Sequence, residues 1–156
     1  MPRPLLARDI MVTKILTLSP ETHLHEAAQF LLKNNISGAP VVNEAGELVG
    51  MFSEQDMMTA LIDAAYDNLP SSEIGSMMTR DLNTIDEEAD LLAIVQIFQN
   101  KAVRRLQVVR EGKLVGQLSR RDVIAAVVKL LEPTSDHKSA ILYLSALREP
   151  PQAPLD

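Results

Sequence analysis

The chain has 156 residues, enough for one compact domain or for two half-size units that share a core. Hydrophobic residues make up 46% and charged residues 23%, a balance typical of globular rather than disordered chains. The net charge of −6 repels nucleic-acid backbones and anionic lipid surfaces, and the lack of cysteine excludes disulfides, thiolate nucleophiles and cysteine zinc sites. We therefore expect no nucleic-acid partner.

No part of the sequence has a membrane-targeting or membrane-spanning pattern. Residues 1–6 lack the apolar run of a secretion signal. No window approaches the roughly 18 apolar residues that are needed to cross a bilayer. The sequence predicts a cytoplasmic protein with no membrane partner.

A ten-residue segment occurs twice. Residues 47–56 (ELVGMFSEQD) align with residues 113–122 (KLVGQLSRRD) at a displacement of 66, and five of the ten positions are identical. Upstream the displacement becomes 67, because the turn at residues 43–46 is one residue longer than its counterpart at 110–112. For the segments that begin the two copies we expect a displacement of 66 residues again, which pairs Met11 with Met77 and Thr13 with Thr79.

Each copy is predicted to fold as strand, helix, strand, strand, helix. In the first copy, residues 15–18 form a short strand ended by Pro20. Residues 40–42 and 48–52 form a hairpin rich in β-branched residues, and Ser53 begins the closing helix. Apolar positions at helical spacing are Leu24, Ala27, Ala28, Leu31 and Leu32 in the first helix and Met57, Leu61 and Ile62 in the second.

The second copy repeats this plan. Residues 91–98 form its first helix, residues 106–109 and 113–118 its hairpin, and Ser119 begins its closing helix. The apolar positions of its helices are Leu91, Ile94, Val95 and Phe98, then Val123, Ala126, Val127 and Leu130.

These elements define the expected domain organisation. We assign residues 7–67 and 73–132 to the two copies and 68–72 to a linker, followed by a C-terminal helix at 134–149 and a disordered tail at 150–156. Copies of about 60 residues bury too little surface alone. We therefore expect an α/β (α+β) fold in which two β-α-β-β-α repeats pack sheet to sheet as a pseudo-twofold pair, with a cleft between them.

The repeated Ser-x-x-Asp pattern has a simple structural explanation. A serine at a helix start caps free amides, and an aspartate three residues later favours the positive end of the helix dipole. Capping alone accounts for each serine and aspartate, so the pattern by itself does not identify a binding site.

The whole set of motifs resembles the CBS (cystathionine β-synthase type) domain family over roughly residues 7–131, as a free-standing tandem pair or Bateman module. The resemblance rests on residues 11–13 (MVT), 77–79 (MMT) and 36–42 (ISGAPVV), and on Leu-Val-Gly-x-x-Ser-x-x-Asp written twice. It implies a non-catalytic regulatory module whose ligand contains adenosine: AMP, ADP, ATP or S-adenosylmethionine. It also implies that the aspartate accepts hydrogen bonds from the ribose, that the serine and helix start face the phosphates, and that the base lies against the opposite repeat.

Carried over by position, the resemblance implies two pockets. The first pocket combines Asp122, Ser119, Leu118, Arg120 and Arg121 with Thr13, Ile15, Leu16, Ile36, Ser37, Gly38, Ala39 and Pro40. The second combines Asp56, Ser53 and Phe52 with Thr79, Leu82, Val103, Arg104 and Arg105.

We expect the first pocket to be the better phosphate site. Its residues 37–39 are small and let a flat base approach the backbone, and Arg120 and Arg121 offer guanidinium groups. The second pocket departs from the family pattern because Arg104 and Arg105 replace small residues and Gln107 replaces the proline. The second pocket is therefore predicted to bind its ligand more weakly than the first.

The remaining predictions concern catalysis, metals and partners. No phosphate-binding glycine loop, no nucleophile elbow and no histidine near a candidate serine is present, so we expect no enzyme. His23 and His25 are two residues apart and point to different faces, which argues against a metal pair. We expect a homodimer that associates through exposed helices; the alternatives are a constitutive dimerisation or interaction scaffold with vestigial pockets, and a regulatory subunit acting in trans on an enzyme or transporter.

Overall fold

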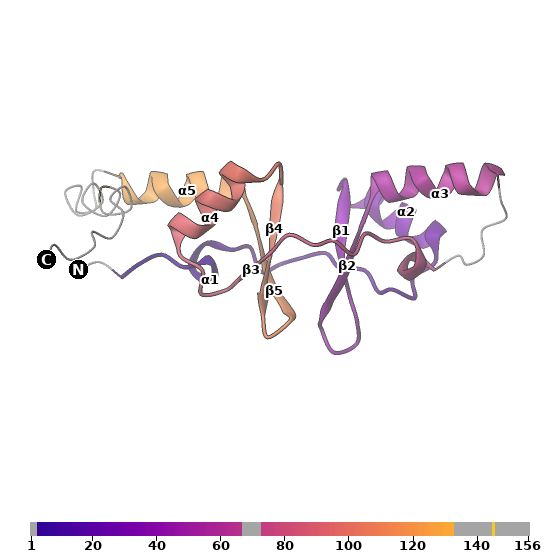
Figure 1. Cartoon of the computed structure of the whole chain (residues 1–156), viewed down its shortest axis with the longest axis horizontal. Helices are drawn as coiled ribbons and strands as arrows, with labels where there is room; N and C mark the ends of the chain where they lie inside the picture. The colour runs from indigo at the N-terminus through magenta and orange to yellow at the C-terminus, as the bar shows by residue number, and fades with distance from the viewer. Residues whose placement is uncertain (1–2, 67–72, 133–144, 146–156) are drawn as a thin grey trace, which may run out of the picture.

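The computed structural model describes residues 3–66, 73–132 and 145. The expected linker at 68–72, the tail at 150–156 and, apart from Ser145, the expected helix at 134–149 lie outside the described residues. Two sheets face each other at the centre of the molecule, and each carries helices on its outer side (Figure 1). The α/β pair of sheet-to-sheet repeats predicted from the sequence is therefore confirmed.

The first repeat contains a two-stranded antiparallel sheet. Strand β1 (Gly38–Val42) pairs with β2 (Leu48–Ser53), and helices α2 (Leu24–Lys33) and α3 (Glu54–Tyr66) cover its outer face. These elements agree with the predicted helix, hairpin and closing helix.

The second repeat contains a three-stranded sheet in the order β3 (Thr84–Asp86), β4 (Arg105–Arg110), β5 (Lys113–Ser119). Strand β3 is parallel to β4, and β4 is antiparallel to β5. Helices α4 (Leu91–Asn100) and α5 (Arg120–Leu130) cover the outer face.

The hairpin turns explain how the repeats differ by one residue without losing register. Gly46 and Gly112 both have positive φ, +83° and +80°, at equivalent places in the two turns. The register of both hairpins shifts at the same place, between Val41 and Val42 and between Val108 and Val109. The extra residue is absorbed in the turn, so the strands behind it remain equivalent.

The strand predicted at residues 15–18 is reduced to a single parallel bridge between Leu18 and Val41. Its counterpart in the second repeat is the full strand β3, which is followed by a bond from the Glu87 N–H to the Val109 carbonyl. Pro20 occupies the position of Glu87, and Pro40 that of Gln107, whose N–H donates to the Asn83 carbonyl; neither proline has an N–H to donate. The ladder of the first repeat therefore cannot continue.

The two cores lie between each sheet and its helices. In the first core Ala27, Leu31, Val41 and Phe52 are buried. In the second core the buried residues include Leu91, Ile94, Phe98, Leu106, Val108, Leu118 and Val123. Four positions that helical spacing placed on apolar stripes are exposed instead: Leu32, Leu61, Ile62 and Val95.

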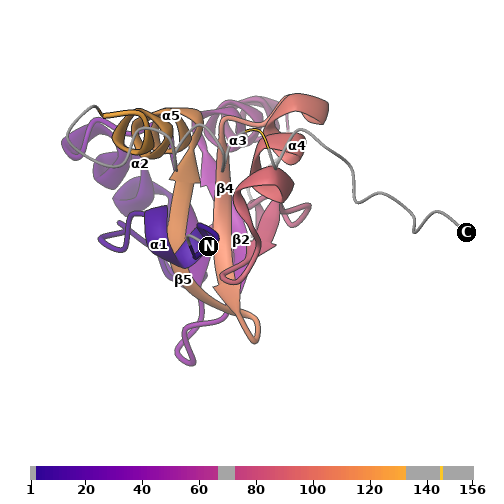
Figure 2. The ribbon, with the colours of Figure 1, turned by 90° about the vertical axis from the view of Figure 1, so that its left-hand side faces the viewer.

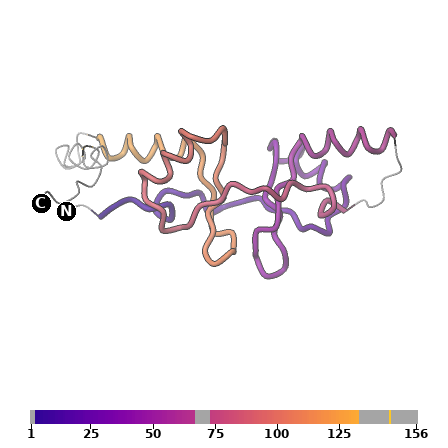
Figure 3. The backbone as a smooth tube through the Cα atoms, viewed as in Figure 1, coloured from indigo at the N-terminus to yellow at the C-terminus, as the bar shows by residue number. Residues whose placement is uncertain are grey.

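The segment that opens each repeat packs into the core of the other repeat. Short helix α1 (Ala7–Ile10) buries Ala7 in the second core, and the turn η1 (Ile74–Ser76) buries Ile74 in the first. The Ala7 N–H donates to the Ala89 carbonyl, and the equivalent bond runs from Ile74 to Thr22. Figure 3 shows the two chain segments that cross between the halves.

These contacts correct the expected alignment of the opening segments. Met11 packs against Gly116, and Met78, not Met77, packs against Gly50. Val12 pairs with Gln117, whereas Thr79 pairs with Met51. The opening segments are therefore displaced by 67, not 66, and Val12 rather than Thr13 is the counterpart of Thr79.

The glycine of each Leu-Val-Gly motif makes room for these methionines. A Cβ atom added at Gly50 or Gly116 would lie under 3.0 Å from the side chain of Met78 or Met11, respectively. Any side chain at either glycine would therefore force the methionine side chain packed against it to move.

No helix in the described ranges is long and apolar enough to span a membrane. The four long helices lie toward one edge of the molecule and the hairpin turns toward the opposite edge (Figure 1, Figure 2). Near the turns, the backbones of Glu47 and Lys113 form an antiparallel bridge that joins the two hairpins.

We expect Gly116→Ala to lower the free energy of unfolding by about 1–3 kcal/mol, the usual cost of forcing extra volume into a packed site. Urea denaturation measures this change. The double variant Met11→Ala, Gly116→Ala should lose less stability than the sum of the two single variants, because the smaller side chain relieves the clash. Additive losses would contradict a direct contact between these residues.

Candidate functional site

The two repeated Ser-x-x-Asp motifs form the same hydrogen-bonded cap at the start of α3 and α5. The Ser53 N–H and hydroxyl donate to Asp56 Oδ2 at 2.9 and 3.0 Å, and the Asp56 N–H donates back to Ser53 Oγ at 3.3 Å. In the second repeat the Ser119 N–H and hydroxyl donate to Asp122 Oδ2 at 2.8 and 2.9 Å. The capping role expected from the sequence is confirmed, and it uses one oxygen of each carboxylate.

The second carboxylate oxygen distinguishes the repeats. Asp56 Oδ1 accepts a hydrogen bond of 2.8 Å from the Thr79 hydroxyl, which belongs to the opening segment of the second repeat. Within residues 3–66 and 73–132, Asp122 Oδ1 has no hydrogen-bond partner, because the counterpart of Thr79 is Val12. The Asp122 carboxylate thus has one oxygen left for a donor from outside the chain.

A crevice of about 270 Å³ lies between the two repeats. Four of its lining residues come from β1, β2 and the residue before β1, and five come from the second repeat. They are Ser37, Gly38, Met51 and Ser53, with Asp81, Asn83, Arg104, Arg105 and Gln107. The crevice therefore unites Ser37 and Gly38, expected in the first pocket, with Ser53, Arg104 and Arg105, expected in the second.

The crevice has a positive balance of charge. Arg104 and Arg105 are both exposed, and neither takes part in an ion pair within the described part of the chain. Asp81 is the single carboxylate among the lining residues. Two guanidinium groups without a carboxylate partner suit the oxygens of a phosphate or carboxylate ligand.

Several residues expected at the pockets have side chains that fill or pack against the cores and are not among the residues that line the crevice. Leu118 is fully buried in the second core, and Ala39 and Phe52 are fully buried in the first. Ile36 and Val103 are half-buried and pack against the first and second core respectively. Of the others, Ile15 and Leu82 are half-buried, Pro40 is buried, and Thr13 and Leu16 are exposed.

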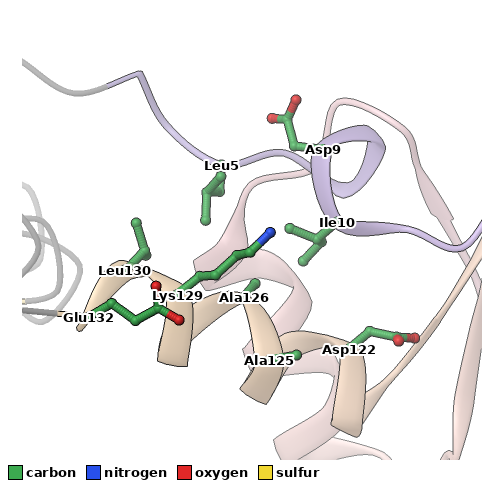
Figure 4. A pocket seen from close by; sticks show the side chains of 9 residues that line it. All are labelled: Leu5, Asp9, Ile10, Asp122, Ala125, Ala126, Lys129, Leu130 and Glu132. Carbon is green, nitrogen blue, oxygen red and sulfur yellow. The ribbon is translucent and has the colours of Figure 1, made fainter. Parts of the chain in front are cut away.

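Asp122 does not line this crevice but lies in a groove of about 620 Å³ between α1 and α5. Its carboxylate is at the end of this groove far from Leu130 and Glu132, and Leu5, Ile10 and Lys129 lie between the two ends (Figure 4). The expected neighbour Arg120 lines a different groove, together with Val95 and Phe98 of α4. Arg121 is exposed.

Residues Met51, Asp81, Asn83 and Gln107 line the crevice but were not among the predicted site residues. The alternation of β4 contained a signal for one of them. Leu106 and Val108 belong to the core, so Arg105 and Gln107 must point to the opposite face, toward the other repeat. Among the described residues, no group of three or more histidine, aspartate or glutamate side chains could hold a metal ion.

The fold and the site define a pair of tandem α/β repeats with capped aspartates and a polar crevice between the sheets. A family model for the CBS domain matches the chain twice, over residues 7–63 and 73–129. The chain therefore belongs to the CBS domain family, as the repeated motifs indicated.

The chain is similar to one protein of known sequence and to two solved structures described below. Protein MJ1225 of Methanocaldococcus jannaschii is 32% identical over 117 residues, which are 75% of this chain and 41% of that protein. The chain thus spans less than half the length of this relative. The crystal structure of CBSX2 in complex with AMP has a TM-score of 0.70 at 24% identity, covering 81% of this chain and 98% of that one. The CBS domain pair of MJ0100, in complex with 5′-methylthioadenosine and S-adenosyl-L-methionine, has a TM-score of 0.64 at 25% identity, with coverage of 81% and 98%.

Proposed function

We propose that this chain is a non-catalytic regulatory module that binds an adenosine-containing ligand, AMP, ADP, ATP or S-adenosylmethionine, between its two CBS repeats. The observation that carries the proposal is the crevice in which Ser53 of one repeat meets Arg104 and Arg105 of the other. Two structural relatives support the ligand class, since one was solved with AMP and the other with two adenosine compounds.

The aspartates are proposed to receive the ribose. A ribose has two neighbouring hydroxyl donors, and a carboxylate oxygen is a strong acceptor for them. Asp122 Oδ1 can accept such a bond without losing an internal one, whereas Asp56 Oδ1 must first release the Thr79 hydroxyl. The Asp122 pocket, with Ser119, Arg121 and the segments at residues 13–16 and 36–40, therefore remains the proposed stronger site.

Titration with a panel of AMP, ADP, ATP and S-adenosylmethionine, followed by thermal unfolding, tests the ligand class. At about 100 times its dissociation constant, a ligand that binds only the folded protein adds about 2.7 kcal/mol of stability. Ribose 5-phosphate, which lacks the base, is the matched control and should give a much smaller shift. A melting temperature unchanged by every adenosine compound would favour a constitutive scaffold with vestigial pockets.

We expect Asp122→Ala to weaken binding of the best ligand more than Asp56→Ala does. The reason is that Asp122 has an unused carboxylate oxygen, whereas that of Asp56 already holds Thr79. Isothermal titration calorimetry on both variants measures the difference, and urea unfolding checks that each variant is folded. Equal losses of affinity would contradict the proposed ranking of the two pockets.

We further propose a cytoplasmic homodimer that associates through its exposed helices. Large apolar side chains are exposed on α3, including Leu61 and Ile62, and on α5, including Ile124 and Val128. Ile62 and Ile124 are 60% and 63% exposed. Because both helices lie toward the same edge of the molecule, a second copy can cover them together (Figure 1).

The double variant Ile62→Glu, Ile124→Glu should be monomeric, because a dimer would bury two unpaired carboxylates per chain. Light scattering after size-exclusion chromatography gives the mass. Ala45→Glu, in the exposed turn between β1 and β2 at the opposite edge, should stay dimeric. A wild-type chain with the mass of a monomer would overturn this part of the proposal.

A further inference from the structure

Gln107 is a buried polar residue with an unsatisfied acceptor. The residue is only 3% exposed, and its Oε1 atom has no hydrogen-bond partner. Among the described residues, this is the one buried side-chain nitrogen or oxygen left without a partner. Buried polar groups are otherwise nearly always paired, so this atom needs a donor that the described chain does not supply.

The strand alternation directs Gln107 into the crevice between the repeats. Leu106 and Val108 on either side of it belong to the second core. Gln107 therefore lies on the opposite face of β4 with Arg105, and both residues line the crevice. Because Gln107 lines this crevice, we take the crevice as the route by which a donor reaches Oε1.

The equivalent position of the first repeat is Pro40, at the displacement of 67 that aligns Val41 with Val108. Proline has no side-chain hydrogen-bonding group. A side-chain acceptor at this position is therefore present in the second repeat and not in the first. If the fold itself required the acceptor, both repeats would have one.

The other lining groups indicate the rest of the ligand. Met51 offers a polarisable thioether to a flat ring, and Arg104 and Arg105 offer guanidinium groups to phosphate oxygens. A volume of about 270 Å³ is slightly below the range of about 300–1,000 Å³ that is typical of small-molecule pockets. It suits a mononucleotide better than a dinucleotide.

We propose that Gln107 is the specificity-determining residue of this crevice, accepting a hydrogen bond from the exocyclic amino group of a purine. The inference rests on the proposed function and deepens it, because it states how this chain selects the base. The side-chain amide of glutamine pairs with the amino group and ring nitrogen of adenine. A 6-oxo purine offers a carbonyl at the same place and leaves Oε1 unpaired.

AMP and IMP are the appropriate probes, because they differ in the 6-amino and 6-oxo groups. Calorimetry is carried out on the full chain with Asp122→Ala, so that binding in the proposed Asp122 pocket does not hide binding in the crevice. We expect AMP to bind at least about tenfold more tightly than IMP, because a site built to hydrogen-bond a substrate group discriminates against analogues that lack it. Adding Gln107→Leu should weaken the binding of AMP by a similar factor. The ratio of the affinities for AMP and IMP should then be close to one.

The matched control is Gln96→Leu. Gln96 is exposed on α4 and lies outside the crevice lining, so this change should leave the AMP-to-IMP ratio unaltered. Without ligand, Gln107→Leu should unfold at the same or a higher urea concentration, because it removes an unsatisfied buried polar group. Gln107→Met serves as a second variant if leucine prevents folding.

The outcomes separate this inference from the proposed function. Failure of the wild-type chain to bind any adenosine compound overturns both. Binding of AMP by the wild-type chain but not by the Asp122→Ala chain overturns the inference alone, and so does a preference for AMP that survives Gln107→Leu.

Discussion

The exchange of opening segments is the constraint on which the rest of the structure depends. Ala7 and Ile74 are fully buried, each in the core of the repeat to which it does not belong in sequence. Met11 and Met78 then cross the opposite sheet where a glycine leaves room. Because each core is completed by the other repeat, neither closes alone, and the two sheets are held face to face.

The same exchange creates the site. The segment that follows Met78 brings the Thr79 hydroxyl to Asp56, so a side chain of one repeat contacts a helix start of the other. Both capped aspartates are therefore structural, and because the cap occupies one carboxylate oxygen only, Asp122 keeps an oxygen that has no partner within the described chain, whereas that of Asp56 holds Thr79. A ligand that replaced a contact such as the Thr79–Asp56 hydrogen bond would change the junction between the repeats. A regulatory signal would have to begin at this junction.

The pseudo-twofold relation holds for the backbone and not for the chemistry. Thr79 corresponds to Val12, and Gln107 corresponds to Pro40, so each half presents different groups to equivalent places. The backbone is shared because the burial pattern and the turns are shared. The polar groups diverge because they face the space between the sheets, where neither core packing nor strand pairing dictates the side chain.

The sequence by itself determined the two repeats, their hairpins and helices, the caps at Ser53 and Ser119 and the membership of a family, because these follow from local periodicity, turn residues and spacing. Only the tertiary structure decided the 67-residue displacement of the opening segments, the loss of a strand before Pro20, the exposure of apolar stripe positions and the buried, unpaired Gln107. Each of these depends on which segments meet across the molecule. Contacts between residues distant in sequence leave no periodic pattern in the chain, so local rules indicated at most the face of β4 on which Gln107 lies and the place where Pro20 ends a strand.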